Sequence, residues 1–263
     1  MSNSSPIGFF DSGVGGTSIW KEVIQLLPRE HSIYLSDSKN APYGEKPIEE
    51  IIALSKKNTE KLLAMGCKII VVACNTATTN AIQILRDTYP LPIIGIEPAI
   101  KPAALKSQTK SIGILATKGT LSSKLFSKTS ELYSENINII EVVGNGLVSL
   151  IEQGRQNSTE IKELLSKLLK PMLDARIDYL VLGCSHYPYL LPVLKEILPA
   201  DVTIIDSGEA VARQTKKVLL ENELMNTSAN NSKHILYSNA DPDILAKLVA
   251  AEENNLEVTY LDF

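Results

Sequence analysis

Two short segments of the sequence place a cysteine and two hydrogen-bonding residues directly after an apolar run. They read VVACNTA, with Cys74, Asn75 and Thr76, and LVLGCSHYP, with Cys184, Ser185 and His186. A free cysteine is among the most frequently buried residue types, so core packing would explain either segment alone. In open α/β sheets, however, reactive residues lie at the carboxyl ends of strands, and a helix N-terminus there lowers the pKa of a cysteine. The matched polar neighbours favour chemistry for the pair.

Two thiols that face one another across a cleft are suited to inverting a carbon centre. One thiol removes a proton from one face of the carbon and the other delivers a proton to the opposite face. The reverse reaction exchanges these roles. An ordinary thiol has a pKa of about 8.5, which modest tuning brings to the working range of a general acid or base. We therefore expect Cys74 and Cys184 to act together.

A glycine-rich loop, DSGVGG at residues 11–16, precedes the first helical pattern. Glycines in such a loop let backbone N–H groups approach a carboxylate or phosphate. The last glycine of a dinucleotide fingerprint is missing, because Ser18 stands in its place. Asp11 in this loop could stabilise the turn, meet an ammonium group or orient a thiol. The segment APYG, residues 41–44, predicts a turn when considered alone.

Short apolar runs alternate with amphipathic helical patterns along the chain. Strands are predicted at 7–10, 32–37, 68–74, 92–97, 111–117, 138–143, 178–184, 202–206, 234–238 and 258–262. Helices are predicted near 17–27, 47–65, 76–88, 121–133, 158–174 and 189–197. Another helix is expected to begin with Asp241 as its N-cap and Pro242 at its first position. This alternation favours parallel sheets built from βαβ units.

The two cysteine segments align without a gap, and IGFFDSG resembles IGILATKG, which favours an internal duplication. We therefore predict an α/β protein with two similar doubly wound domains and mostly parallel sheets. The domains would be related by a pseudo-twofold axis, with a cleft between them. The first would comprise residues 1–98 and 207–263, because the C-terminal tail is expected to pack back on the first half. The second would comprise residues 99–206.

The bulk composition narrows the possible classes. The chain has 263 residues, of which 44% are hydrophobic and 21% charged, as in ordinary globular proteins. A net charge of −4 without a basic block argues against a nucleic-acid partner. No signal peptide or membrane span is recognisable, so we expect a cytoplasmic protein. Its cysteines lack CxxC spacing, and His31 and His234 stand alone, so no metal centre is predicted.

Four motifs, DSGVGG, APYG, VVACNTA and LGCSHYP, occur in this order and together resemble glutamate racemases. That family interconverts L- and D-glutamate without a cofactor. The resemblance extends from Ile7 to the C-terminal strand and implies two α/β domains around a buried cleft. It implies glutamate as the small-molecule substrate, no pyridoxal phosphate, metal or nucleotide, and a role in supplying D-glutamate for peptidoglycan synthesis. Members of the family are commonly dimers, so we expect a homodimer.

The resemblance also assigns roles to residues. Cys74 would deprotonate D-glutamate with the assistance of Asp11, and Cys184 would deprotonate L-glutamate with the assistance of Glu152 and His186. The substrate-binding residues that it implies are Asp11, Ser12, Tyr43, Gly44, Asn75, Thr76, Thr117, Ser185 and His186.

The sequence departs from the family pattern at three places. Ser185 stands where threonine is usual, which keeps the hydroxyl group and removes one methyl group worth about 0.8 kcal/mol if buried. Thr17 stands where leucine is common, and LSDSKN replaces a GDT-type segment while Asp37 remains. None of these changes touches the thiols, so we expect the activity to remain.

Three other functions are compatible with the same residues. The first is a racemase of another amino acid, such as aspartate, with the same thiols and a different pocket. The second is an acyl-transfer enzyme that uses Cys184 and His186, although adjacency in the sequence does not establish a thiolate–imidazole pair. The third is a noncatalytic module that binds amino acids.

Overall fold

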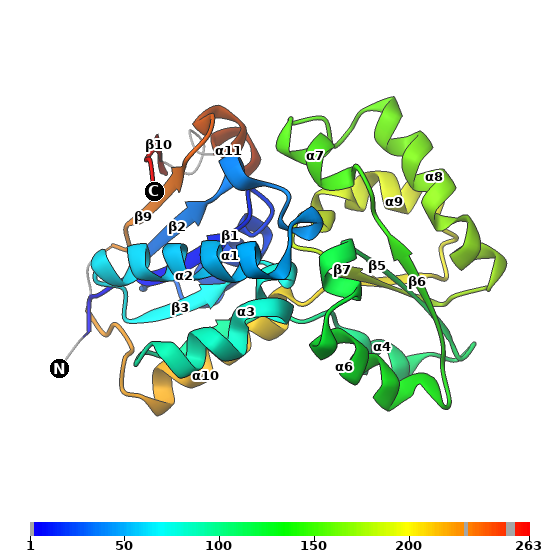
Figure 1. Ribbon diagram of the computed structural model, residues 1–263, viewed down its shortest axis with the longest axis horizontal. Helices are drawn as coiled ribbons and strands as arrows, with labels where there is room; N and C mark the ends of the chain where they lie inside the picture. Colours follow the sequence, from blue (N-terminus) through cyan, green and yellow to red (C-terminus); the bar gives the residue numbers. More distant parts are fainter. Residues whose placement is uncertain (1–2, 229–230, 251–255) are drawn as a thin grey trace.

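The computed structural model describes residues 3–228, 231–250 and 256–263, and these form two parallel sheets (Figure 1). The six-stranded sheet has the order β10-β9-β2-β1-β3-β4 and the four-stranded sheet the order β6-β5-β7-β8. Their strands are β1 (Ile7–Asp11), β2 (Ser32–Ser36), β3 (Ile69–Val72), β4 (Ile93–Gly95), β5 (Ser111–Ala116), β6 (Asn138–Val143), β7 (Tyr179–Gly183), β8 (Thr203–Ile205), β9 (His234–Ser238) and β10 (Glu257–Tyr260). The predicted α/β class with parallel sheets is confirmed. We call the six-stranded sheet with its helices the first unit and the four-stranded sheet with its helices the second unit.

The two sheets share one pattern of connections. In the first unit, β1 lies between β2 and β3, and β4 follows β3; in the second, β5 lies between β6 and β7, and β8 follows β7. Every strand pairing in the described part of the chain is parallel. The segments that carry Cys74 and Cys184 therefore follow corresponding strands, β3 and β7.

The register of the central strands brings the ends of both cysteine strands to a sheet edge. Phe10 of β1 is opposite Val72 of β3, and Ala116 of β5 is opposite Gly183 of β7. Both strands of the first pair are buried throughout their length, as expected for apolar runs covered on two faces. The residues that follow each pair therefore lie side by side at the carboxyl edge of their sheet.

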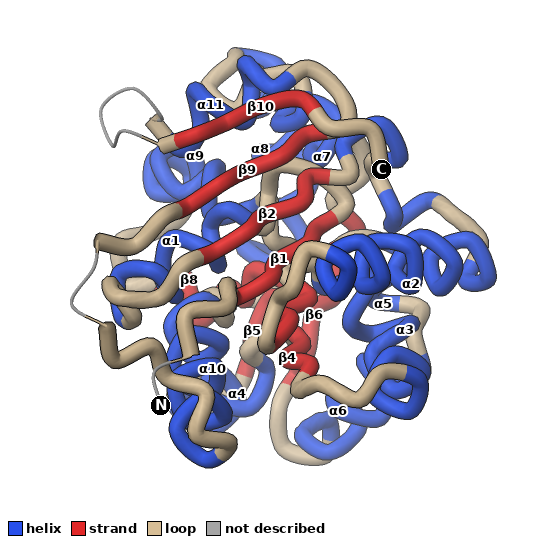
Figure 2. Tube along the Cα trace, turned by 90° about the vertical axis from the view of Figure 1, so that its left-hand side faces the viewer, coloured by secondary structure: helices blue, strands red, loops and turns tan. Residues whose placement is uncertain are grey.

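Helices cover both faces of the first sheet, with α2 and α3 on one side and α1 and α10 on the other (Figure 2). The α-helices are α1 (Thr17–Leu26), α2 (Ile48–Ala64), α3 (Asn75–Thr88), α4 (Ile100–Lys106), α5 (Lys118–Leu121), α6 (Lys124–Ser134), α7 (Leu147–Glu152), α8 (Thr159–Asp174), α9 (Leu191–Ile197), α10 (Gly208–Glu221) and α11 (Pro242–Val249). Short 3₁₀ helices are η1 (Ser38–Asn40), η2 (Tyr43–Glu45) and η3 (Tyr187–Leu190).

The structure corrects several helix predictions. The helix expected near 121–133 is α6, which begins only at Lys124 because the Ser123 side chain caps it by accepting from the Phe126 N–H at 3.2 Å; the short α5 before it had no prediction. The helix expected near 189–197 begins as the 3₁₀ helix η3, and α4 and α7 had no prediction. The Asp241 cap is confirmed, since its side chain accepts from the Asp243 N–H at 2.9 Å, with Pro242 opening α11.

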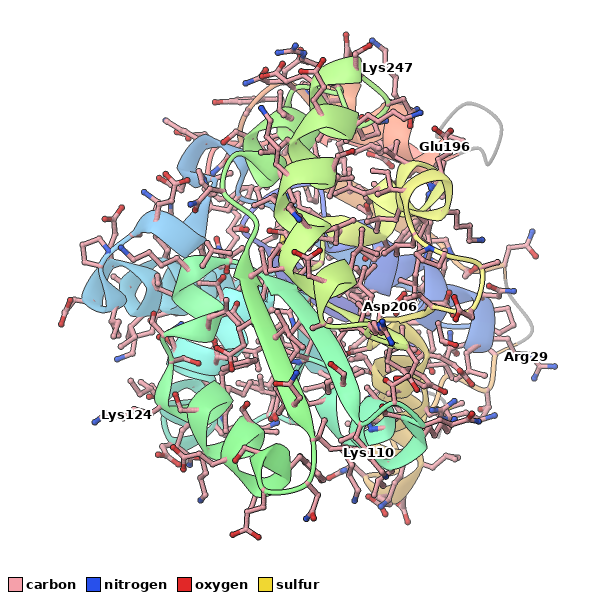
Figure 3. All side chains as sticks on the ribbon, turned by 90° about the vertical axis from the view of Figure 1, so that its right-hand side faces the viewer. Arg29, Lys110, Lys124, Glu196, Asp206 and Lys247 are labelled. Atoms are coloured by element: carbon pink, nitrogen blue, oxygen red, sulfur yellow. The ribbon has the colours of Figure 1, made fainter. Side chains whose placement is uncertain are left out.

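The largest apolar cluster joins the two units. It includes Phe9 and Trp20 of the first unit and Leu165 and Leu182 of the second. A large apolar side chain contributes about 1.5–3 kcal/mol when fully buried, so contact between the units is part of the core. The outer face of the second unit carries exposed charged side chains, among them Lys110 and Lys124 (Figure 3). Within the described ranges, no helix combines the length and apolarity needed to cross a bilayer.

Candidate active site

A small pocket lies between the units at the carboxyl ends of the strands. About 10 Å³ of it is open to the centre of a water-sized sphere, roughly what one water molecule needs, so the pocket is nearly closed in this structure. Its walls include both Cys74 and Cys184 and every predicted substrate-binding residue except Asp11. Pro42 and Val148, which the sequence had not indicated, complete the lining. The structure thus gathers the four motifs around one small pocket.

Cys74 lies at the N-terminus of α3, in a buried polar setting. Its sulfur donates to Ser12 Oγ at 3.7 Å and accepts from the Ala77 N–H at 3.4 Å. Burial raises the pKa of Cys74 well above its ordinary value, and the nearby Asp11 carboxylate raises it further. Both hydrogen bonds lower the pKa but do not compensate. The helix N-terminus thus lowers this pKa through the Ala77 N–H, as expected, but burial outweighs it, and Cys74 is a neutral thiol at rest.

Asp11 is completely buried at the end of β1. Its Oδ2 accepts from the Gly16 N–H at 2.7 Å, and its Oδ1 accepts from the hydroxyls of Ser12 at 3.5 Å and Ser185 at 3.2 Å. Burial raises the pKa of Asp11 and outweighs the lowering by His186 and by the Gly16 hydrogen bond. Asp11 thus stabilises the turn, as one of its three interpretations predicted, and links both units behind the pocket.

Cys184 lies beside a histidine–carboxylate pair. His186 Nδ1 is 3.8 Å from Cys184 Sγ, and His186 Nε2 is 2.5 Å from Glu152 Oε1 at the end of α7. Burial lowers the pKa of His186, but the contacts with Cys184 and Glu152 and the charge of Asp11 outweigh it, so this pKa stays well above its ordinary value. The ring is therefore cationic at neutral pH and stabilises negative charge on the neighbouring sulfur.

The glycine-rich loop binds carboxylates of the protein itself. The Val14 N–H donates to Glu152 Oε1 at 2.7 Å, and the Gly16 N–H donates to Asp11. These two N–H groups of the loop are thus engaged by the protein's own carboxylates. A Cβ atom at Gly15 would lie 2.2 Å from His186 Nδ1, so only glycine permits this close approach of the loop.

Asn75 presents an unpaired amide to the pocket. The side chain is 2% exposed, and neither its Oδ1 nor its Nδ2 has a hydrogen-bond partner among the described residues. A buried polar group without a partner costs about 1–3 kcal/mol, which a polar ligand would relieve. Close by, the hydroxyls of Thr76 and Thr117 lie 2.8 Å apart and connect α3 of the first unit to the start of α5 in the second.

Tyr43 and Gly44, the first two residues of η2, form one wall of the pocket. The Tyr43 hydroxyl donates to the Asp37 carboxylate and accepts from Asn58 Nδ2 at 3.0 Å. Burial, reinforced by Asp37, raises the pKa of Tyr43 well above its ordinary value. A Cβ atom at Gly44 would lie 2.6 Å from Thr117 Cβ, so this glycine permits close contact between the units.

Two supporting residues were missed by the sequence interpretation. Asn58 faces inward on α2, and its spacing of seven from the apolar Ile51 signals a polar residue on the buried face. Ser38 donates to Glu152 Oε2 at 2.7 Å, and no pattern in the sequence relates residues so distant. Within the described part of the chain, no group of three His, Cys, Asp or Glu side chains is arranged to hold a metal ion.

Comparison with known proteins agrees with this geometry. The Asp/Glu/hydantoin racemase family matches residues 10–215. A glutamate racemase of Cupriavidus pinatubonensis is 48% identical over 222 residues, which cover 84% of this chain and 82% of the relative.

Two solved structures have the same fold. Escherichia coli glutamate racemase, in complex with L-glutamate and the activator UDP-MurNAc-Ala, has a TM-score of 0.84 and 31% identity, with 97% of each chain covered. Francisella tularensis glutamate racemase, in complex with D-glutamate, has a TM-score of 0.81 and 28% identity, with 94% of each chain covered. The family match includes the whole stretch from Ser12 to His186 that lines the pocket.

Proposed function

The chain belongs to the Asp/Glu/hydantoin racemase family, and we propose that it interconverts L-glutamate and D-glutamate by proton transfer at Cα. The observation that carries this proposal is the meeting of Cys74 and Cys184 in one pocket, each at the end of a corresponding strand. We infer glutamate as the substrate because relatives are named glutamate racemases and two of the solved structures contain bound glutamate.

The different surroundings of the two thiols support a two-base mechanism. In the L-to-D direction, Cys184 removes the Cα proton, so that the Cα–H bond breaks and an S–H bond forms. Cationic His186, held by Glu152, stabilises the Cys184 thiolate that starts this step. Cys74, a neutral thiol at rest, delivers its proton to the opposite face of Cα. Breaking the Cys74 S–H bond leaves Cys74 as the thiolate and Cys184 as the thiol, and the D-to-L direction starts from that state with the roles exchanged.

The remaining polar groups of the pocket are suited to binding an amino acid with two carboxylates. The Asn75 amide offers two donors and an acceptor, and the hydroxyls of Thr76 and Thr117 offer further polar contacts, whereas those of Ser12 and Ser185 can donate to a ligand only by turning away from Asp11. Hydroxyl and amide donors bind carboxylates without a neutralising cation. We therefore assign the substrate contacts to these side chains and to Tyr43, Gly44 and His186.

The same proposal extends to the setting of the reaction. We propose that catalysis needs no pyridoxal phosphate, nucleotide or metal, and that neither a nucleic acid nor a membrane takes part. D-Glutamate would be supplied for peptidoglycan synthesis, and hence for cell wall biogenesis and cell shape, in the cytoplasm. We further propose a homodimer whose chains each comprise one domain of residues 1–98 and 207–263 and another of residues 99–206.

The proposal is tested by incubating the protein with single enantiomers of glutamate and aspartate in D₂O. Loss of optical rotation together with deuteration at Cα is expected for glutamate. An aspartate racemase would show both changes with aspartate instead, whereas an acyl-transfer enzyme or a binding module would show neither with any substrate.

Cysteine variants then test the roles of the thiols. Cys74→Ser and Cys184→Ser should each lower kcat by about 10²–10⁴-fold, because a hydroxyl is a much weaker acid than a thiol. Cys67→Ala is the matched control, since Cys67 is buried outside the pocket lining and should be dispensable for activity. A kcat above about a tenth of the wild-type value, less loss than the range for a positioned acid–base group, would remove that thiol from the mechanism.

A further inference from the structure

A hydrogen bond between two hydroxyls joins the first unit to the segment that follows Cys184. Thr17 Oγ1, at the start of α1, lies 2.5 Å from the hydroxyl oxygen of Tyr189 in η3. Thr17 is fully buried, and neither residue lines the pocket. Burial raises the pKa of Tyr189 to about 12, so its hydroxyl stays protonated at neutral pH and is able to donate.

The other contact of Thr17 decides the direction of this bond. The Thr17 hydroxyl has a single hydrogen, which it donates to the backbone oxygen of Val14 at 2.6 Å. Tyr189 must therefore be the donor to Thr17. Two hydrogen bonds in series run from Tyr189 through Thr17 to the Val14 carbonyl, and they fasten the Val14–Thr17 turn to the second unit.

The same turn carries a hydrogen bond that leads back to the reactive thiol. The Val14 N–H donates to Glu152 Oε1 at 2.7 Å, and that oxygen lies 2.5 Å from His186 Nε2. His186 Nδ1 is in turn 3.8 Å from Cys184 Sγ. The path leaves the second unit at Tyr189, returns to it at Glu152 and ends at the thiol.

We propose that Thr17 and Tyr189 are positioning residues for the half-reaction at Cys184, because they hold the Val14 N–H where it keeps Glu152 aligned with His186. The proposal rests on the proposed racemase function, since it requires Cys184 to exchange a proton with Cα. We call the Tyr189–Thr17–Val14 series of hydrogen bonds the latch.

The latch does not pass through the other thiol. Cys74 is held by Ser12 and by the Ala77 N–H, both within the first unit. Loss of the latch should therefore slow proton transfer at Cys184 more than at Cys74. A general loosening of the two units would instead affect both thiols.

Tyr189→Phe removes the hydroxyl and keeps the aromatic ring, which lies 5.6 Å from Lys21 Nζ. Since one hydrogen bond between neutral groups is lost, we expect kcat to fall about two- to tenfold. Thr17→Val breaks the same latch from the other side. The double variant should be no slower than Thr17→Val alone, because the latch is already broken in the single variant.

The diagnostic measurement is the primary deuterium isotope effect on kcat/KM, with each enantiomer of glutamate deuterated at Cα. If the step at Cys184 slows, removal of the proton from L-glutamate limits the rate more strongly, so the isotope effect on L-glutamate rises. The effect on D-glutamate falls, because the later step at Cys184 then limits the reaction. The isotope effect on L-glutamate divided by that on D-glutamate is therefore expected to rise in Tyr189→Phe and in Thr17→Val.

Tyr187→Phe is the matched control. Tyr187 lies in the same 3₁₀ helix, and its hydroxyl donates to the Gly144 carbonyl at 3.2 Å within the second unit. The Tyr187→Phe substitution removes one tyrosine hydroxyl from η3 and leaves the hydrogen bonds of the latch intact. The ratio of isotope effects should then stay at the wild-type value, even if stability falls.

The outcomes are distinct. A raised ratio in both latch variants, with a double variant no slower than Thr17→Val, supports the proposal. The proposal is overturned if the ratio in Tyr189→Phe is unchanged from wild type, or if the rate losses of the two substitutions multiply in the double variant. The proposed function still stands in that case, provided that the wild-type protein racemises glutamate. A wild-type protein that does not racemise glutamate overturns both.

Discussion

Replacement of Gly15 by alanine should inactivate the protein without unfolding it. Gly15 is where the backbone of the glycine-rich loop packs against His186, whose ring lies between Glu152 and Cys184. The substitution adds one methyl group at this point and changes no charge or hydrogen-bonding group. Its effect on the reaction should therefore come from displacement alone.

The structure sets the size of that displacement. The added Cβ would lie 2.2 Å from His186 Nδ1, 2.3 Å from Cγ and 2.6 Å from the backbone nitrogen of His186. An ordinary contact is 3.4 Å or longer, so the ring or the loop must move by about 1 Å. A misplacement of about 1 Å can cost on the order of 10²-fold in rate, and we expect kcat to fall by at least that factor.

Gly66→Ala is the matched control for this prediction. Gly66 has a φ of +78°, and a Cβ there would meet nothing within 4 Å. The alanine should cost about 1–2 kcal/mol of stability, because L-residues disfavour the left-handed region, and leave kcat unchanged. Thermal unfolding and kcat with both enantiomers are measured for both variants. Near-normal kcat in Gly15→Ala would refute the inferred packing of the loop against His186.

Three further predictions concern other parts of the molecule. Lys68→Met should lower the free energy of unfolding, measured by chemical denaturation, by about 3–5 kcal/mol, because it leaves buried Glu30 without its ion-pair partner. The kcat of the folded protein should persist, since Lys68 precedes β3 at the edge opposite the pocket. Asp11→Asn should lower kcat but raise stability at pH 7, because the raised pKa of Asp11 means that its ionised form is disfavoured in the folded state. This gain should shrink as pH falls below the raised pKa of Asp11 in the folded state and vanish near pH 4, where the unfolded carboxyl is also protonated. Cys74→Ser and Cys184→Ser chains that are unfolded and refolded together should stay inactive, because both thiols line one pocket of a single chain. Pull-down of a tagged chain verifies that mixed dimers have formed. Recovery of activity in them would show a site shared between chains.

The elements that could be predicted are those whose signal is local. The buried run Ile7–Asp11 forms β1, and the amphipathic pattern near 47–65 forms α2. Asp241 caps α11 because an Asx side chain before proline satisfies a free N–H of the first turn. By the same local rule, Ser123 could have been recognised as the cap that starts the helix expected near 121–133.

The support of the site could not be predicted, because it depends on contacts between distant residues. Val14 and Glu152 are 138 positions apart, and Thr17 and Tyr189 are 172 positions apart. A glycine-rich loop that precedes a helix indicates an anion site, but not that the anion is a carboxylate of the same chain. The helix N-terminus at Cys74 likewise suggested a lowered pKa, whereas burial, which depends on the whole fold, reverses the direction.

The two thiols occupy corresponding positions in the two sheets, but their neighbours differ in a way that a two-base reaction requires. At any moment one thiol must be able to give a proton while the other is able to take one, so two identical environments would leave both in the same state. Burial beside Asp11 keeps Cys74 protonated, whereas the sulfur of Cys184 lies 3.8 Å from Nδ1 of His186, whose pKa is raised by its contacts. The repeated strands therefore bring the two thiols to corresponding positions. The residues that follow each cysteine, Asn75 and Thr76 in one segment and Ser185 and His186 in the other, make the surroundings of the two thiols different. Replacing His186 by asparagine should remove much of this inequality, and the loss should appear first in the step that begins at Cys184.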